Sequence, residues 1–185
     1  GGDPRNGADV ERMFAACVEA FGRPDILVNN AGGFAQQPLA ETDDETFERV
    51  FGLNCRGTLF CLKHASLLLN DEGRIVNIGS SSATFTWPDT AMYASSKAAV
   101  LKMTEVAAVE LGVRRINVNS VIPGITDTPM AKALSDEAKQ PIIDATPRHR
   151  LGTPDDIAGV VAFLVGPDAV WVTGQHILAN GGSGH

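Results

Sequence analysis

The stretch Arg74-Ile75-Val76-Asn77-Ile78 decides the fold class of this 185-residue chain. Gly73 introduces it, and its apolar residues follow one another almost without alternation, which is typical of a strand covered by helices on both faces. Ile26-Leu27-Val28 and the run from Ile116 to Ile122 repeat the pattern before and after it. Helical periodicity separates these strands, so the sequence predicts the α/β class with a parallel sheet.

The helices are expected between the strands. They should cover residues 8–22, 43–69, 90–112 and 153–166. Thr42-Asp43-Asp44-Glu45 reads as a capping box for the second helix. Gly112 should end the third, and a last strand should cover Thr173 to Leu178.

The segment 125–150 differs from the rest because it carries Pro129, Pro141 and Pro147. We predict short helices there, in a lid that closes over the substrate. No repeat or linker interrupts the chain, so residues 1–185 should form one domain.

Composition excludes several classes of function. The net charge of −7 disfavours nucleic acid as a partner. No apolar run approaches the roughly 18 residues of a membrane helix, and no secretion signal opens the chain, so the expected location is cytoplasmic. The three cysteines and four histidines show no metal-ligand spacing. Buried free thiols and no metal site are therefore expected.

Tyr93-Ala94-Ser95-Ser96-Lys97 is the strongest sign of chemistry. Residues four apart share one helix face, so the Tyr93 phenol and the Lys97 ammonium should lie together. A free phenol titrates near pH ~10, and a neighbouring cation favours phenolate. The pair therefore predicts a tyrosine whose pKa is lowered toward the working range, although a surface tyrosine beside a solvated lysine shows the same spacing.

Other polar residues follow the strands. Ser80 lies just past the strand 74–78, at the carboxyl end, where open parallel sheets bind ligands. Asn29-Asn30-Ala31-Gly32-Gly33 and Pro123-Gly124 end the neighbouring strands on the same side. Asn54 sits in an apolar context, either as a satisfied core amide or as a holder of water.

Taken in order, these motifs resemble the short-chain dehydrogenase/reductase family across essentially the whole chain. The matching positions are Asn29-Asn30-Ala31-Gly32, Asn54, Ser80, Tyr93, Lys97, Asn119, Pro123-Gly124 and Thr128. Two positions depart from the family pattern: Gly79 replaces a common serine, and Asn180 replaces a common aspartate.

The resemblance implies a Rossmann-like doubly wound sheet and an NAD(P)-dependent oxidoreductase that interconverts a carbonyl and an alcohol. It makes Tyr93 the acid/base, assisted by Lys97, which also holds the nicotinamide ribose. Ser80 would orient the substrate oxygen, and Asn54 would hold a water. The cofactor-binding residues would be Asn30, Ala31, Gly32, Tyr93, Lys97, Pro123, Gly124, Ile125 and Thr128. Relatives commonly form homodimers or homotetramers through the two long helices.

The family's glycine-rich phosphate turn is not found before the first helix. We therefore expect the first βαβαβ portion, about 60 residues, to be missing. The choice between NAD and NADP cannot be read, the 185-residue chain should bind dinucleotide poorly, and the strand 26–28 should be a bare edge.

Two alternatives remain. Gly79-Ser80-Ser81-Ser82-Ala83 nearly matches the nucleophile elbow of serine hydrolases, with His149 or His176 as base. The chain could instead be a truncated, non-catalytic member of the family that acts as an oligomerisation or regulatory module.

Overall fold

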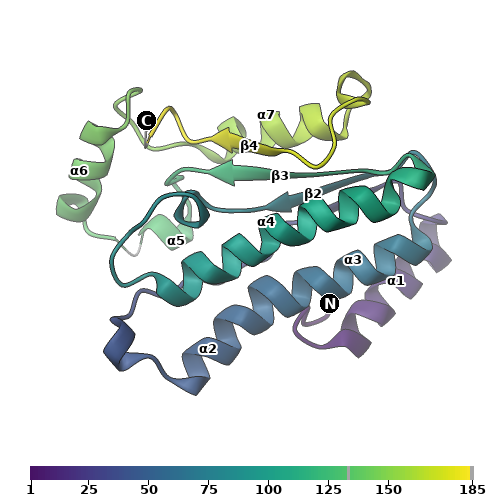
Figure 1. Ribbon diagram of the computed structural model, residues 1–185, viewed down its shortest axis with the longest axis horizontal. Coiled ribbons are helices and arrows are strands. Elements are labelled where there is room, and N and C mark those ends of the chain that lie inside the picture. The colour runs from purple at the N-terminus through teal and green to yellow at the C-terminus, as the bar shows by residue number, and fades with distance from the viewer. Residues whose placement is uncertain (133, 184–185) are drawn as a thin grey trace.

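A parallel sheet organises the computed structural model, which describes residues 1–132 and 134–183 (Figure 1). Its described strands lie in the order β1-β2-β3-β4. They are β1 (Ile26–Asn29), β2 (Arg74–Ile78), β3 (Asn117–Pro123) and β4 (His176–Ala179). All three pairings are parallel. The predicted α/β class is confirmed.

Helices cover both faces of the sheet, as a doubly wound fold requires (Figure 1). One face carries α1 (Gly7–Phe21), α2 (Asp44–Phe51), α3 (Thr58–Leu68) and α4 (Ala91–Leu111), and the other carries α7 (Pro154–Val165). Two apolar clusters result, one between the sheet and α1, α3 and α4, the other between the sheet and α7. Val118 and Val121 of β3 belong to different clusters, because successive strand residues point to opposite faces.

A polar ladder crosses the buried sheet beside the first cluster. Asn29 Nδ2 donates to Asn77 Oδ1 at 2.8 Å, and Asn77 Nδ2 donates to Thr104 Oγ1 at 2.9 Å. Asn77 and Thr104 are fully buried, so each needs such a partner. The ladder ties β1 and β2 to α4.

The predicted helix 43–69 forms with a defect. Asp43, not Thr42, caps it by accepting from Thr46 N at 2.8 Å. A π-helical turn, Gly52–Gly57, separates α2 from α3. Turns of this kind often occur at functional sites, and this one contains Asn54.

Two smaller expectations, a helix end at Gly112 and buried cysteines, have different outcomes. α4 ends at Leu111 with Gly112 as its C-cap, as predicted. Gly112 is in right-handed geometry, however, and begins a 3-10 turn that the left-handed Arg115 ends. Of the three free cysteines, Cys61 is buried, whereas Cys17 and Cys55 are partly exposed.

The segment 125–150 forms short helices as predicted, α5 (Pro129–Lys132) and α6 (Asp136–Ala145). Its two ends are joined, because Gly152 N donates to Ile125 O at 2.9 Å and Asp127 N donates to Gly152 O at 2.8 Å. The segment therefore leaves the sheet and returns to one point beyond β3 (Figure 1). Its role as a lid stays a prediction.

Candidate active site

The predicted site residues gather at the carboxyl edge of the sheet. Asn30, Ala31 and Gly32 follow β1, Ser80 follows β2, and Gly124 follows the last residue of β3. Since parallel strands end at the same edge, the fold brings these three segments side by side. Tyr93 and Lys97, from the first two turns of α4, lie against them.

Tyr93 is nearly buried, with 9% of its surface exposed. Burial raises its pKa above the usual value, and a hydrogen bond with Ser80 acts in the opposite direction. The expected lowering of this pKa by Lys97 was therefore wrong for the chain alone. Ser80 therefore lies close enough to Tyr93 to act on its phenol.

Lys97 is 6% exposed and donates from Nζ to Ile78 O at 2.8 Å. Burial lowers its pKa from 10.5 to about 8, and the nearby thiol of Cys55 partly offsets that effect. Lys97 and Tyr93 occupy the same buried face of α4, as their spacing predicts. The ammonium points to the end of β2, beside the turn after β1.

Asn54 resolves as a satisfied core amide. Gly33 N donates to its Oδ1 at 2.8 Å, while its Nδ2 donates to Gly33 O and to Ser96 Oγ, both at 2.9 Å. Both N–H groups of this 1% exposed side chain are used inside the protein. A water held by Asn54 would therefore have to hydrogen bond to an atom of this residue other than Nδ2.

Gly32 shows how closely the segments approach. A Cβ at this position would lie 3.2 Å from Lys97 Nζ and 3.3 Å from Asn54 Oδ1. Any side chain would therefore push against two candidate catalytic residues. A side chain at this position would require Lys97 or Asn54 to shift by a few tenths of an ångström, and glycine avoids that shift.

The remaining predicted positions lie around this centre. Asn30 and Ala31 are exposed, and Pro123, Gly124, Ile125 and Thr128 are half-buried. Gly124 N donates to Ala179 O at 3.2 Å, and Thr128 Oγ1 donates to Thr126 O at 3.2 Å. In the described chain no group of three histidine, cysteine or acidic residues could hold a metal ion.

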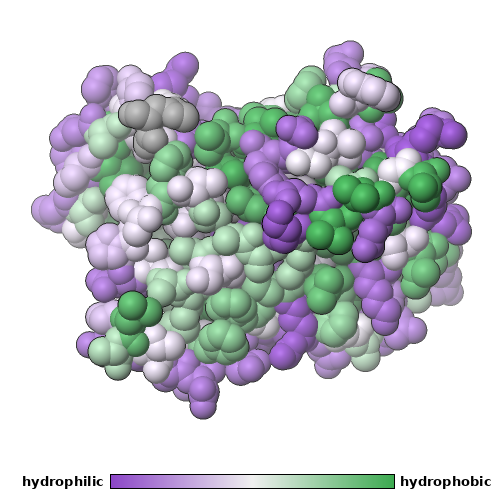
Figure 2. Space-filling model, in the orientation of Figure 1, coloured by the Kyte–Doolittle hydropathy of each residue, from purple (hydrophilic) through white to green (hydrophobic). Residues whose placement is uncertain are grey.

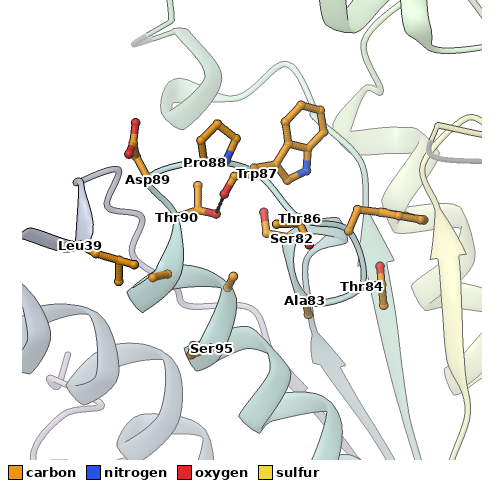
Figure 3. A pocket seen from close by; sticks show the side chains of 13 residues that line it. Leu39, Ser82, Ala83, Thr84, Thr86, Trp87, Pro88, Asp89, Thr90 and Ser95 are labelled. Atoms are coloured by element: carbon orange, nitrogen blue, oxygen red, sulfur yellow. Dashed lines mark hydrogen bonds between the residues drawn. The ribbon is translucent and has the colours of Figure 1, made fainter.

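A cavity of about 420 Å³ lies beside this centre but does not contain it (Figure 3). The segment 82–90 lines it, together with Leu39 and with Ala91, Ala94 and Ser95 of α4. At 100° per residue, Ala91 and Ser95 lie opposite Tyr93 on the helix, and Ala94 lies about 100° from it. No described residue of the segment 125–150, which is predicted to close over the substrate, lines this cavity.

The nucleophile elbow expected of a hydrolase does not form. Ser80 caps a 3-10 turn, Ser81–Ala83, and α4 begins only at Ala91, whereas an elbow runs directly into a helix.

A different serine contacts His176. Ser120 Oγ lies 2.7 Å from His176 Nδ1, whose Nε2 lies 3.0 Å from Glu105 Oε1. Ser120 is fully buried in β3, so this chain of contacts ties two strands to α4 rather than offering a nucleophile.

The sequence did not predict two residues that contact the site, Ser96 and Phe34. Ser96 hydrogen bonds to Asn54, and its own hydroxyl donates to Tyr93 O at 2.7 Å. Its place between Tyr93 and Lys97 could have drawn attention to it. Phe34 packs against the ring of Tyr93, and no pattern in the sequence signals that contact.

Known proteins resemble this chain along nearly its whole length. Residues 2–184 match the family described as enoyl-(acyl carrier protein) reductase. The chain is 39% identical over 183 residues to an uncharacterized oxidoreductase of Methylorubrum extorquens, covering 97% of this chain and 74% of that protein. It is also 39% identical over 182 residues to the (2S)-[(R)-hydroxy(phenyl)methyl]succinyl-CoA dehydrogenase subunit BbsD of Thauera aromatica, covering 97% and 73%.

Solved structures are equally similar. A blue fluorescent protein from a metagenomic library, in complex with NADPH, superposes with a TM-score of 0.95 at 36% identity. The superposition covers 100% of this chain and 74% of that protein. A dehydrogenase/reductase from Sinorhizobium meliloti gives a TM-score of 0.95 at 40% identity, covering 100% of this chain and 73% of that protein.

The fold and site define an NAD(P)-linked oxidoreductase with a Rossmann-like sheet. The chain belongs to the short-chain dehydrogenase/reductase family.

Proposed function

We propose that this protein interconverts a carbonyl and an alcohol with NAD or NADP, and that Tyr93 exchanges the proton. The observation that carries the proposal is the assembly of Tyr93, Ser80 and Lys97 at the carboxyl edge of the sheet. Relatives of the chain carry names of oxidoreductases, and one similar structure holds NADPH. The substrate is a small carbonyl or alcohol compound.

The residues present fit the nicotinamide end of the cofactor. The ammonium of Lys97 has three donors, and one of them meets Ile78 O, so two can serve ribose hydroxyls. Because Gly32 has no side chain, nothing at this position fills the space next to the Lys97 ammonium. The preceding residues Asn30 and Ala31 are exposed. The nicotinamide ring would be bordered from the end of β3 by Pro123, Gly124, Ile125 and Thr128.

Proton transfer follows from the protein groups. When bound, a nicotinamide cofactor would supply the hydride for reduction of the carbonyl carbon, or accept it from the alcohol. During reduction the Tyr93 hydroxyl gives its proton to the carbonyl oxygen as that oxygen takes the C=O electron pair. Ser80 donates a hydrogen bond to the same oxygen and orients it.

The pKa shifts of Tyr93 and Lys97 predict how the rates of reduction and oxidation change with pH. A raised pKa keeps Tyr93 protonated near neutrality, which suits reduction, whereas oxidation needs the phenolate and should rise with pH. Lys97 loses its charge as pH passes its pKa of about 8. We therefore expect reduction to fall above that pH.

The test is NADH and NADPH oxidation with a panel of ketones, using the wild type and Tyr93→Phe. The variant should lose about 10²–10⁴-fold in rate, and no other tyrosine can replace it, since the chain has one. A Tyr93→Phe protein that stays as active as the wild type would refute the assignment.

The non-catalytic alternative rests on exposed apolar side chains along the two long helices. Figure 2 shows apolar surface over α3 and α4, where Leu59, Leu67, Val106 and Val109 are 49–81% exposed. Such a surface fits a homodimer or homotetramer. A folded chain that oligomerises but oxidises neither cofactor with any ketone would favour this alternative.

A further inference from the structure

The ring of Phe34 meets the ring of Tyr93 almost at a right angle. The ring centroids are 4.9 Å apart and the interplanar angle is 76°, which is the edge-to-face geometry that aromatic pairs prefer. Phe34 lies two residues after Gly32, on the segment that follows β1. It therefore reaches Tyr93 from a different element than α4 or β2.

The segment that carries Phe34 is held on both sides. Gly33 makes its two hydrogen bonds with Asn54, and Phe34 O accepts from Arg49 Nη1 at 3.2 Å. Gln37 N then donates to Asp89 O at 2.6 Å, in the loop before α4. A ring fixed at both flanks of its backbone can act as a rigid wall rather than a mobile cover.

We infer that Phe34 is a positioning residue for proton transfer, which holds the Tyr93 ring in place and keeps water away from it. The inference rests on the proposed role of Tyr93 as acid/base. Ser80 after β2 also acts on the pKa of this phenol. Lys97 lies on the same buried face of α4, and the charged group that acts on Lys97 is Cys55 of the π-helical turn. Phe34 carries no charge, so its effect is exclusion of solvent and restriction of the ring.

The sole tyrosine makes the first test direct, because phenolate absorption reports Tyr93 alone. The variants are Phe34→Leu and Phe34→Ala. Burial is the main cause that raises the pKa of Tyr93, so letting water in should lower the pH at which it ionises. The shift should be larger for alanine than for leucine, which refills part of the space.

Phe47 supplies a matched control. It stacks on Phe51 in α2 with ring centroids 4.4 Å apart, and it is 41% exposed. Phe47→Leu and Phe47→Ala also remove one ring of an aromatic pair, but they should leave the Tyr93 titration unchanged. Circular dichroism at each pH establishes that the phenol ionises in folded protein.

Nitration by tetranitromethane near neutral pH gives a second readout that avoids alkaline unfolding. Nitrotyrosine should form several-fold faster in the Phe34 variants than in the wild type or the Phe47 variants. A folded Phe34→Leu or Phe34→Ala protein that titrates and is nitrated like the wild type would overturn the inference.

Activity separates this inference from the proposed function. If both hold, the Phe34 variants lower kcat more than they raise KM, and the pH profile moves in the same direction as the titration. If Tyr93→Phe keeps full activity, the proposed function fails, whatever the titrations show. An altered titration with an unchanged kcat and pH profile would reduce Phe34 to a packing residue.

Discussion

Lys97 Nζ donates its 2.8 Å hydrogen bond to the main-chain oxygen of Ile78, at the end of β2. The ammonium is thus buried with a neutral partner, and burial lowers its pKa to about 8. In unfolded chains the pKa of lysine stays near 10.4. Near neutral pH the folded protein therefore bears the cost of a desolvated charge, which is what a site built to hold a ligand would show.

We predict that Lys97→Met stabilises the protein at pH 7. Both folded and unfolded wild type are protonated there, so the burial cost is fully present, on the order of 2–3 kcal/mol. Between pH 8 and about 10.4 the unfolded state binds more protons than the folded state, so wild-type stability rises and the advantage of methionine shrinks. Urea unfolding at pH 7 and pH 9.5 measures this difference.

Lys102→Met is the matched control, because its side chain lies on the same helix and is 72% exposed. It should change the free energy of unfolding little at either pH. Equal stability of Lys97→Met and wild type at pH 7 would mean that the ammonium is solvated in the folded protein. The Lys97 variant should also lose hydride-transfer activity, whichever way its stability moves.

Ser96 and Ser95 are neighbours with opposite environments. Ser96 is fully buried and links Asn54 to Tyr93 O, whereas Ser95 is exposed. Ser96→Ala leaves an Asn54 N–H buried without a partner, which costs about 1–3 kcal/mol. Ser95→Ala should lie within about 0.5 kcal/mol of wild type. Thermal or urea unfolding compares them, and equal losses would contradict the hydrogen-bond argument.

The sequence predicted the elements better than their details. Short apolar runs such as Arg74–Ile78 identify buried strands because burial on both faces leaves no alternation. The helix predicted to start at Thr153 was also correct, and a capping box forms there, whose two reciprocal hydrogen bonds depend only on residues three apart. No local pattern predicted the π-helical turn at Asn54, and the hydrogen bonds of this side chain to Gly33 and Ser96 join residues that are distant in the sequence.

The candidate site was likewise predicted in part. The Tyr93–Lys97 face follows from helical spacing, so it could be read from the chain alone. The raised pKa of Tyr93 could not, because it depends on burial that Phe34 and the end of β2 create in three dimensions. Spacing predicts which residues share a face, but not how much solvent reaches them.

Asp156 anchors the point where the segment 125–150 returns to the fold. Its carboxylate accepts from Arg150 Nη1 at 2.6 Å and from Thr153 N at 2.7 Å, and these bonds hold its pKa well below the usual range. A depressed pKa adds stability above the unfolded value, and this stability is lost as pH falls through the folded value. Asp156→Asn should therefore lower Tm at pH 7.

Asp155 provides the comparison for this variant, because it lies in the same first turn of α7. Asp155→Asn should lower Tm less than Asp156→Asn at pH 7. The gap between the two should narrow as pH falls below 4, where the unfolded-state carboxyl is protonated. A gap that stays constant with pH would show that the effect of Asp156 comes from its shape rather than its charge.

The free edge of β1 is the last feature with a measurable consequence. β1 pairs on one side with β2 and ends the described sheet on the other, and Ile26 and Val28 are 47% and 40% exposed. An apolar edge strand invites pairing with another chain. Ile26→Glu places a carboxylate beside its register partner Arg74, a favourable cross-strand pair, and should reduce aggregation of the 185-residue chain in light scattering.

Val109→Glu distinguishes this edge from the apolar surface of the long helices. Val109 is 81% exposed on α4, so glutamate there adds the same charge without touching the sheet edge. If strand pairing drives association, Ile26→Glu suppresses scattering and Val109→Glu leaves it near wild type, because a charge blocks pairing only where backbone N–H and C=O groups are unpaired. If the opposite ranking is found, the helical face is the surface that associates, and the β1 edge is protected by other means.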